Sequence, residues 1–177
     1  MDATDRAPTV EPLDERVDHV RGPEGTPVVL EYGDYECPYS RKAFRAIEQV
    51  EQELSGGIRF VFRHFPLTQI HPHALAASAA AEAAAQQGRF WEMHAMLFHR
   101  QKALEDEHLL AYASEVGLDG PRFDHDRASE EVMARIARDV ESGDASGVVH
   151  GTPTLFINGV LHEDGYEVAT LLEALQR

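Results

Sequence analysis

The sequence contains very little cysteine, since Cys37 is the only one among 177 residues. A single cysteine excludes a disulfide within the chain, which suits a reducing compartment. It also excludes zinc sites built from several cysteines. Any thiol chemistry of this chain therefore depends on Cys37.

Long apolar runs and positive charge are also scarce. No stretch approaches the roughly 18 apolar residues of a membrane span, so we predict no membrane insertion. Asp and Glu number 31 against 16 Lys and Arg, which gives a net charge of -15 and argues against nucleic acid as a partner. The first 22 residues lack the basic-then-apolar pattern of a signal peptide, so we predict a cytoplasmic protein. Alanine tracts and a preference for Arg over Lys suggest a bacterial source, and we expect a monomer.

The residues around Cys37 predict a strand followed by a helix. Val28 to Tyr32 is apolar and β-branched, as in a buried strand, and apolar residues at helical spacing follow over 38–54. Cys37 stands where the strand gives way to the helix. The free N–H groups and the dipole of a helix N-terminus favour the thiolate, which is the nucleophilic form of cysteine. The alternative is a buried, inert cysteine.

A second motif lies more than a hundred residues downstream, at Gly151-Thr152-Pro153-Thr154. The apolar residues that follow predict a strand, and Asn158-Gly159 is a strong hairpin signal. A proline just before a strand can follow a cis peptide bond, although a plain turn proline is the alternative.

Taken together, Cys-Pro-Tyr-Ser at 37–40 and Gly-Thr-Pro-Thr at 151–154 resemble the motifs of the DsbA-like branch of the thioredoxin superfamily. Phe65-Pro66-Leu67, His71-Pro72-His73 and Gly88 to His94 also look like that family. The resemblance covers roughly residues 17 to 177. It implies an α/β thioredoxin fold with an inserted helical domain. We therefore expect a flexible tail over 1–15, a thioredoxin-like domain in two halves (16–70 and 144–177) and a helical domain over 71–143.

The remaining pattern fits this order of elements. A second strand, parallel to the first, is predicted over 58–65, and a turn over 142–147 returns the chain to the sheet. Further helices are predicted over 74–87, 89–101, 107–116, 121–126, 129 to about 142, and 166–176, with a hairpin of strands over 154–157 and 160–162.

The resemblance also implies roles for individual residues. Cys37 is the expected nucleophile, and Glu31 matches the family's buried acid, with a solvent-facing glutamate as the alternative. Four residues are expected to contact substrate: Pro38, Tyr39, Thr152 and Pro153. Thr152 would present its backbone to an extended peptide or tripeptide, and its hydroxyl would bond to substrate or to Cys37.

Ser40 is the departure from the family, whose redox motif is Cys-x-x-Cys. A serine cannot resolve a mixed disulfide on Cys37, although it could stabilise the thiolate by a hydrogen bond. We predict a monothiol thiol–disulfide oxidoreductase that exchanges with protein or small disulfides. It would use a thiol such as glutathione as co-substrate and no bound cofactor. The alternatives are a redox-inactive peptide- or thiol-binding module, an enzyme like the kappa-type glutathione transferases, or an engineered replacement of a resolving cysteine at position 40.

The ten histidines do not predict a metal site. His94 and His99 are five residues apart, whereas two ligands on one helical face lie three or four apart. His71 and His73 flank a proline and are interpreted as part of a turn that enters a helix.

Overall fold

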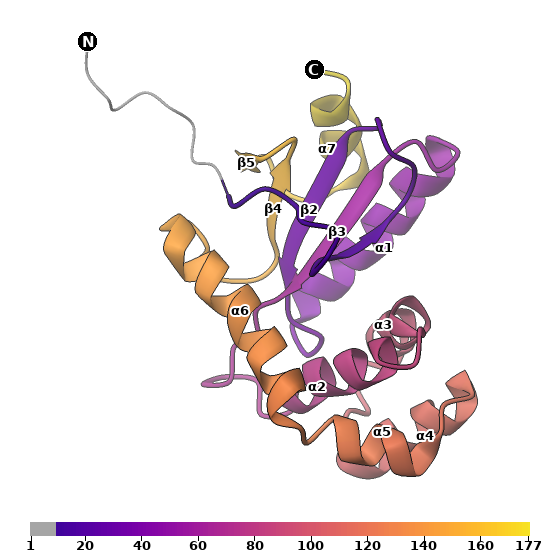
Figure 1. Ribbon diagram of the computed structural model, residues 1–177. Coiled ribbons are helices and arrows are strands. Elements are labelled where there is room, and N and C mark those ends of the chain that lie inside the picture. Colours follow the sequence, from indigo (N-terminus) through magenta and orange to yellow (C-terminus); the bar gives the residue numbers. More distant parts are fainter. Residues whose placement is uncertain (1–9) are drawn as a thin grey trace.

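A computed structural model describes residues 10–177, and its centre is a five-stranded sheet with the order β1-β3-β2-β4-β5. Figure 1 shows the sheet in the upper part of the molecule. The strands are β1 (His19–Arg21), β2 (Val28–Gly33), β3 (Arg59–His64), β4 (Thr154–Ile157) and β5 (Val160–His162). The helices are α1 (Pro38–Glu53), α2 (Ala74–Ala85), α3 (Phe90–His99), α4 (Asp106–Val116), α5 (Gly120–Asp126), α6 (Glu130–Ser146) and α7 (Val168–Leu175).

The predicted α/β class and the parallel pairing of the first two long strands are confirmed. β2 and β3 run parallel with α1 as their crossover, and β4 pairs antiparallel with the other edge of β2. β2 therefore lies in the middle of the sheet, with its residues buried from Val29 onward. This is the strand that leads into the Cys37 turn.

Alternation along β2 divides the core between the two faces of the sheet. Val29 packs with α1 and α7 in one cluster, whereas Leu30 and Tyr32 pack in another that includes Val10. Both faces are thus covered, one of them by helices and the other partly by the N-terminal segment.

A block of helices, α2 to α6, follows β3 and precedes β4, and Figure 1 shows it below the sheet. The alanine-rich α2 is its centre and contacts α3, α4, α5 and α6. Nine of its twelve residues are buried. Alanine side chains permit this close approach because they occupy little space between neighbouring helices.

The expected flexible tail over 1–15 is wrong for residues 10–15, while residues 1–9 lie outside the described part. Val10 is buried, and the carbonyl oxygens of Glu11 and Pro12 accept hydrogen bonds from Arg63. The segment then forms β1, which pairs antiparallel with β3 and was not predicted. With three residues it is too short to show an alternating pattern, so only its tertiary contacts reveal it.

The predicted turn over 142–147 is also wrong, because α6 continues through Ser146. Gly143 suggested a helix end, but it lies inside the helix. A Cβ atom at Gly143 would stand 2.9 Å from Phe65 Cε2 and 3.2 Å from Tyr32 Cε1. The glycine permits close helix–sheet packing, and α6 crosses the expected domain boundary at 143/144.

Candidate active site around Cys37

Cys37 occupies the N-cap position of α1, with φ -74° and ψ 121°. Pro38 follows at the start of the helix, where a missing N–H costs no hydrogen bond. Cys37 is only 3% exposed. The thiol is therefore buried at the N-terminal end of the helix, where the dipole is positive, although its side chain forms no capping hydrogen bond with the helix N–H groups.

The cis-proline loop closes over the thiol from the far end of the sequence. The Thr152–Pro153 peptide bond is cis, and Cys37 Sγ donates to the carbonyl oxygen of Thr152 at 3.3 Å. The Thr152 hydroxyl, expected to bond substrate or Cys37, is buried without a hydrogen-bond partner. The backbone of Thr152, and not its hydroxyl, is thus the group that contacts Cys37.

Two residues that sequence reasoning did not single out hold the turn before Cys37. The Asp34 carboxylate accepts from the N–H of Glu36 at 2.8 Å and of Leu67 at 2.9 Å, and lies 2.7 Å from His71 Nδ1. From the helical block, Gln101 Nε2 donates to the carbonyls of Tyr35 and Cys37, both at 2.8 Å. Asp34 and Gln101 therefore hold the backbone that carries the Cys37 sulfur, and the Thr152 loop contacts the sulfur itself.

Ser40 is fully buried one turn into α1. Its hydroxyl oxygen accepts a hydrogen bond from the Asp34 N–H at 3.2 Å. Among the described residues, no hydrogen bond joins Ser40 to Cys37, in contrast to the bond that we considered from the sequence. Ser40 here fastens the Cys37 turn to the helix.

Glu31 lies on β2 and is 1% exposed, so the alternative of a solvent-facing glutamate is wrong. Its cross-strand neighbours are Phe62 and Leu155, and neither of its carboxyl oxygens has a hydrogen-bond partner. Burial raises the pKa of Glu31 to about 8, with Arg21 opposing the shift. Glu31 is therefore mainly protonated at neutral pH. A Cβ atom at Gly33 would stand 2.9 Å from Glu31 Oε1, which places the carboxyl toward the end of β2 that leads to Cys37.

The other predicted contact residues lie next to Cys37 and Thr152 in the chain. Pro38 and Tyr39 are exposed, Tyr39 to 55%, and Lys42 Nζ lies 5.3 Å from the centre of the Tyr39 ring. Pro153 lines a groove of about 370 Å³ together with Tyr166. The structure thus brings Cys37 and the second motif together and leaves a surface beside them.

The histidines of the predicted helix-entry turn take part in holding this site. The backbone N–H of His73 donates a hydrogen bond to the Glu36 carboxylate at 2.6 Å, and the His73 ring Nδ1 lies 2.9 Å from the other oxygen of that carboxylate. His94 does not pair with His99. It is buried with its Nδ1 2.9 Å from the Tyr35 hydroxyl, and burial lowers its pKa well below the usual value, so it is neutral.

Comparison with known proteins places this arrangement in a family. The Thioredoxin family model matches residues 14–177. A thioredoxin-like oxidoreductase from Silicibacter pomeroyi DSS-3 is 30% identical, covers 92% of both chains and superposes with a TM-score of 0.81. BdbD from Bacillus subtilis and alpha-DsbA2 from Wolbachia pipientis share the fold at 18% and 20% identity, with TM-scores of 0.82 and 0.79. They cover 96% and 92% of this chain, and the matches span 96% and 87% of their own chains.

The curated relatives carry a different kind of name. Proteins named Na(+)/H(+) antiporter NhaA 1 from Salinispora arenicola and Mycolicibacterium gilvum are 46% and 43% identical over 93% of this chain. The match covers only 25% and 27% of those proteins, so this chain spans about a quarter of their length. No helix among residues 10–177 is both long enough and apolar enough to cross a bilayer.

The family model and the 30% identical structure show that the chain belongs to the thioredoxin family, its fold is that of the DsbA-like structures, and Ser40 stands where the Cys-x-x-Cys motif has its second cysteine.

Proposed function

We propose that this protein is a monothiol thiol–disulfide oxidoreductase that acts through Cys37. The observation that carries this proposal is the position of the only thiol, at the N-cap of α1 and in contact with the Thr152–Pro153 loop. A helix N-terminus favours the thiolate, and the contacts of Asp34 and Gln101 fix the backbone that presents it.

The exchange needs one disulfide and one thiol from outside the chain. In the first step, the Cys37 thiolate attacks one sulfur of a disulfide, forms a mixed disulfide and releases the other sulfur as a thiolate. In the second step, an external thiolate attacks the substrate sulfur of the mixed disulfide and Cys37 leaves as the thiolate. Each step breaks one S–S bond and forms one, so no further oxidant or reductant is required.

Within this proposal, Glu31 has the role of a proton-holding group beneath the site. It is buried, has no hydrogen-bond partner and has a pKa of about 8, so it can exchange a proton near neutral pH. Pro38, Tyr39, Thr152 and Pro153 form the proposed contact surface for an extended peptide or a tripeptide such as glutathione. The co-substrate would then be a low-molecular-weight thiol.

Ion transport by the antiporter relatives is not assigned to this chain, because it matches only about a quarter of each of them. A mechanism like that of a kappa-type glutathione transferase would need a serine hydroxyl at the glutathione sulfur. Ser40 is fully buried and bonded to the Asp34 backbone, which favours the Cys37 mechanism.

Intact mass spectrometry tests the proposal directly. The protein is incubated with oxidised glutathione over a pH series and then with reduced glutathione. We expect one glutathionyl group to appear on Cys37 below pH 7 and to leave when free thiol is added, with no adduct on Cys37→Ser. A thiol that stays unmodified until pH 8 or above would instead support a redox-inactive binding module.

A further inference from the structure

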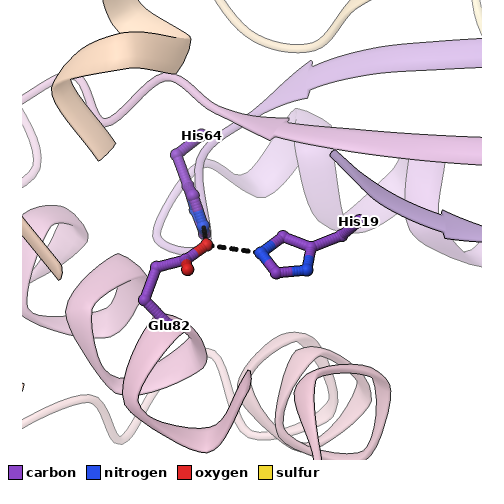
Figure 2. Close-up of side chains that lie close together, drawn as sticks. All are labelled: His19, His64 and Glu82. Atoms are coloured by element: carbon purple, nitrogen blue, oxygen red, sulfur yellow. Dashed lines mark hydrogen bonds and ion pairs between the residues drawn. The ribbon is translucent and has the colours of Figure 1, made fainter. Parts of the chain in front are cut away.

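The structure brings together three side chains that are far apart in the sequence and do not belong to the Cys37 site. His19 on β1, His64 at the end of β3 and Glu82 on α2 meet where the helical block joins the sheet, as Figure 2 shows. Glu82 Oε1 lies 2.5 Å from His19 Nε2 and 2.7 Å from His64 Nε2. One donor atom from each residue lies within 4.8 Å of the other two.

The two imidazole rings are held in place by aromatic neighbours. The His19 ring stacks on Phe90 with 3.5 Å between ring centres and an angle of 7°. The His64 ring meets Phe62 and Phe90 edge to face. Both Nε2 atoms therefore face Glu82 in a site that is organised in advance, unlike exposed histidines that rotate freely.

This cluster is more buried than an ordinary surface ion pair. The His64 side chain is inaccessible and the Glu82 side chain is 6% exposed, whereas His19 keeps 16% of its surface in contact with solvent. The Glu82 carboxylate accepts a hydrogen bond from His64 Nε2, whereas His64 Nδ1 is buried without a partner and is free to take up the proton. An ion can reach the cluster from the His19 side, and the His64 proton can move to Nδ1 when Nε2 becomes a ligand.

We propose that His19, His64 and Glu82 form a binding site for a divalent transition-metal ion of the zinc type. Two imidazoles and one carboxylate are a donor set that binds zinc, and they leave a fourth position for water. With metal–ligand bonds of about 2.0–2.2 Å, neighbouring donors in a tetrahedral site stand about 3.3 Å apart. Binding therefore requires the Glu82 oxygen to separate from His19 Nε2 by about 0.8 Å and from His64 Nε2 by about 0.6 Å.

Such an ion would connect two parts of the fold. His19 and His64 come from neighbouring strands of the sheet, whereas Glu82 comes from the central helix of the helical block. Metal binding would consequently stabilise the junction between sheet and helices, without a role in the exchange at Cys37.

The first experiment is a zinc titration by calorimetry, followed by a cobalt titration read by visible absorption. Both use the full chain with Cys37→Ser, which removes the only thiol as a competing ligand. We expect one zinc ion per chain, and cobalt bands of a four-coordinate site without thiolate charge transfer. The absence of zinc binding at micromolar concentration would overturn the proposal.

Variants in the same background assign the ligands. Glu82→Gln and His19→Ala should each weaken zinc binding at least about tenfold, since even substitutions of residues that only hydrogen-bond to the ligands of a metal have effects of this size. His108→Ala is the matched control, because His108 and Glu105 form an exposed pair at 2.8 Å and belong to no three-residue group of this kind. Equal affinity of all three variants would contradict the site.

Thermal unfolding provides a second readout, and it also shows directly whether each variant is folded. Zinc should raise the unfolding temperature of the Cys37→Ser protein and of its His108→Ala variant, but not of the His19→Ala variant, whose substitution is at the partly exposed edge of the cluster. A zinc-induced shift that persists in His19→Ala would overturn the assignment.

Discussion

At the scale of single residues, the site around Cys37 depends on polar contacts between distant parts of the chain. Position 40 shows this most clearly. Ser40 lies three residues after the only thiol, yet its side chain is buried and hydrogen-bonded to the backbone of Asp34 and not to Cys37. The serine preserves the turn and removes the second sulfur.

Ser40→Cys should therefore restore two-thiol behaviour. After reaction with oxidised glutathione, the variant should lose its glutathionyl group without added thiol and end two hydrogens lighter than the reduced protein. The wild-type adduct should persist under the same conditions. Mass spectrometry after removal of free glutathione distinguishes the two. A persistent adduct on Ser40→Cys would show that the residue at 40 cannot reach Cys37 as a resolving group.

Glu31 makes stability depend on pH in a predictable direction. Its pKa is raised from 4.5 to about 8 in the folded protein, so between these values the unfolded chain has released a proton that the native protein still binds. Stability should therefore fall as pH rises from about 4.5 to 8, by an amount on the order of 5 kcal/mol in total. Glu31→Gln should flatten this slope in urea unfolding at pH 5, 6, 7 and 8. An unchanged slope in the variant would mean that another group causes the dependence.

Gln101 should affect the rate of reaction more than the fold. Gln101→Ala removes two hydrogen bonds that fix the Cys37 turn, at a cost in unfolding free energy of about 1–3 kcal/mol. We expect slower formation of the glutathione adduct at unchanged far-UV circular dichroism.

Gln87→Ala is the matched control for Gln101, because Gln87 also makes two bonds, to the backbone of Asp119, but does so within the helical block. Adduct formation as fast in Gln101→Ala as in Gln87→Ala would show that the turn does not need this anchor.

At the scale of elements, periodicity and turn signals were sufficient where an element has a regular pattern of its own. The hairpin over 154–157 and 160–162 and the parallel strands around α1 are confirmed, because runs of apolar residues and the Asn158-Gly159 turn are local signals. β1 and the end of α6 were missed, since a three-residue strand has no period and Gly143 resembles a helix end. Asp34 and Gln101 were missed as anchors of the Cys37 turn because their contacts join distant segments of the chain, which local patterns do not show.

The packing of α6 on the sheet gives a prediction at this scale. Gly143→Ala should lower the unfolding free energy by about 1–3 kcal/mol, because its new methyl group would lie 2.9 Å from the ring of Phe65. Gly120→Ala in α5 is the control, since a Cβ atom there meets nothing within 4 Å. This control should be neutral or gain up to about 1 kcal/mol from helix propensity. Urea unfolding compares the two, and equal stability of both variants would contradict the close contact.

At the scale of the whole molecule, a buried ionic cluster connects the N-terminal segment, the sheet and α6. Arg63 on β3 forms two 2.9 Å hydrogen bonds with Asp18, and both side chains are inaccessible. Arg138 of α6 reaches the same carboxylate at 3.0 Å. Three distant segments are thus joined through one carboxylate.

Asp18→Ala should accordingly destabilise the protein by about 3–5 kcal/mol, since it leaves the Arg63 charge buried without its partner. Asp14→Ala removes an exposed ion pair with Arg16, whose side chain is 87% exposed, and a hydrogen bond from the Arg16 N–H, so it should destabilise the protein much less than Asp18→Ala. Chemical denaturation of the two variants measures the difference. A cost below 1 kcal/mol for Asp18→Ala would mean that the cluster does not hold the segment.

The contact between Cys37 and Thr152 also joins two parts of the site that are synthesised at different times. The two residues are 115 positions apart, and the helical block lies between them in the chain. During translation the ribosome therefore makes the thiol long before the loop that shelters it and before β4, the strand that completes the sheet beside β2. Until the residues of this loop and of β4 emerge, the thiol of the nascent chain is unsheltered, and its protection from oxidation depends on the reductants around the ribosome.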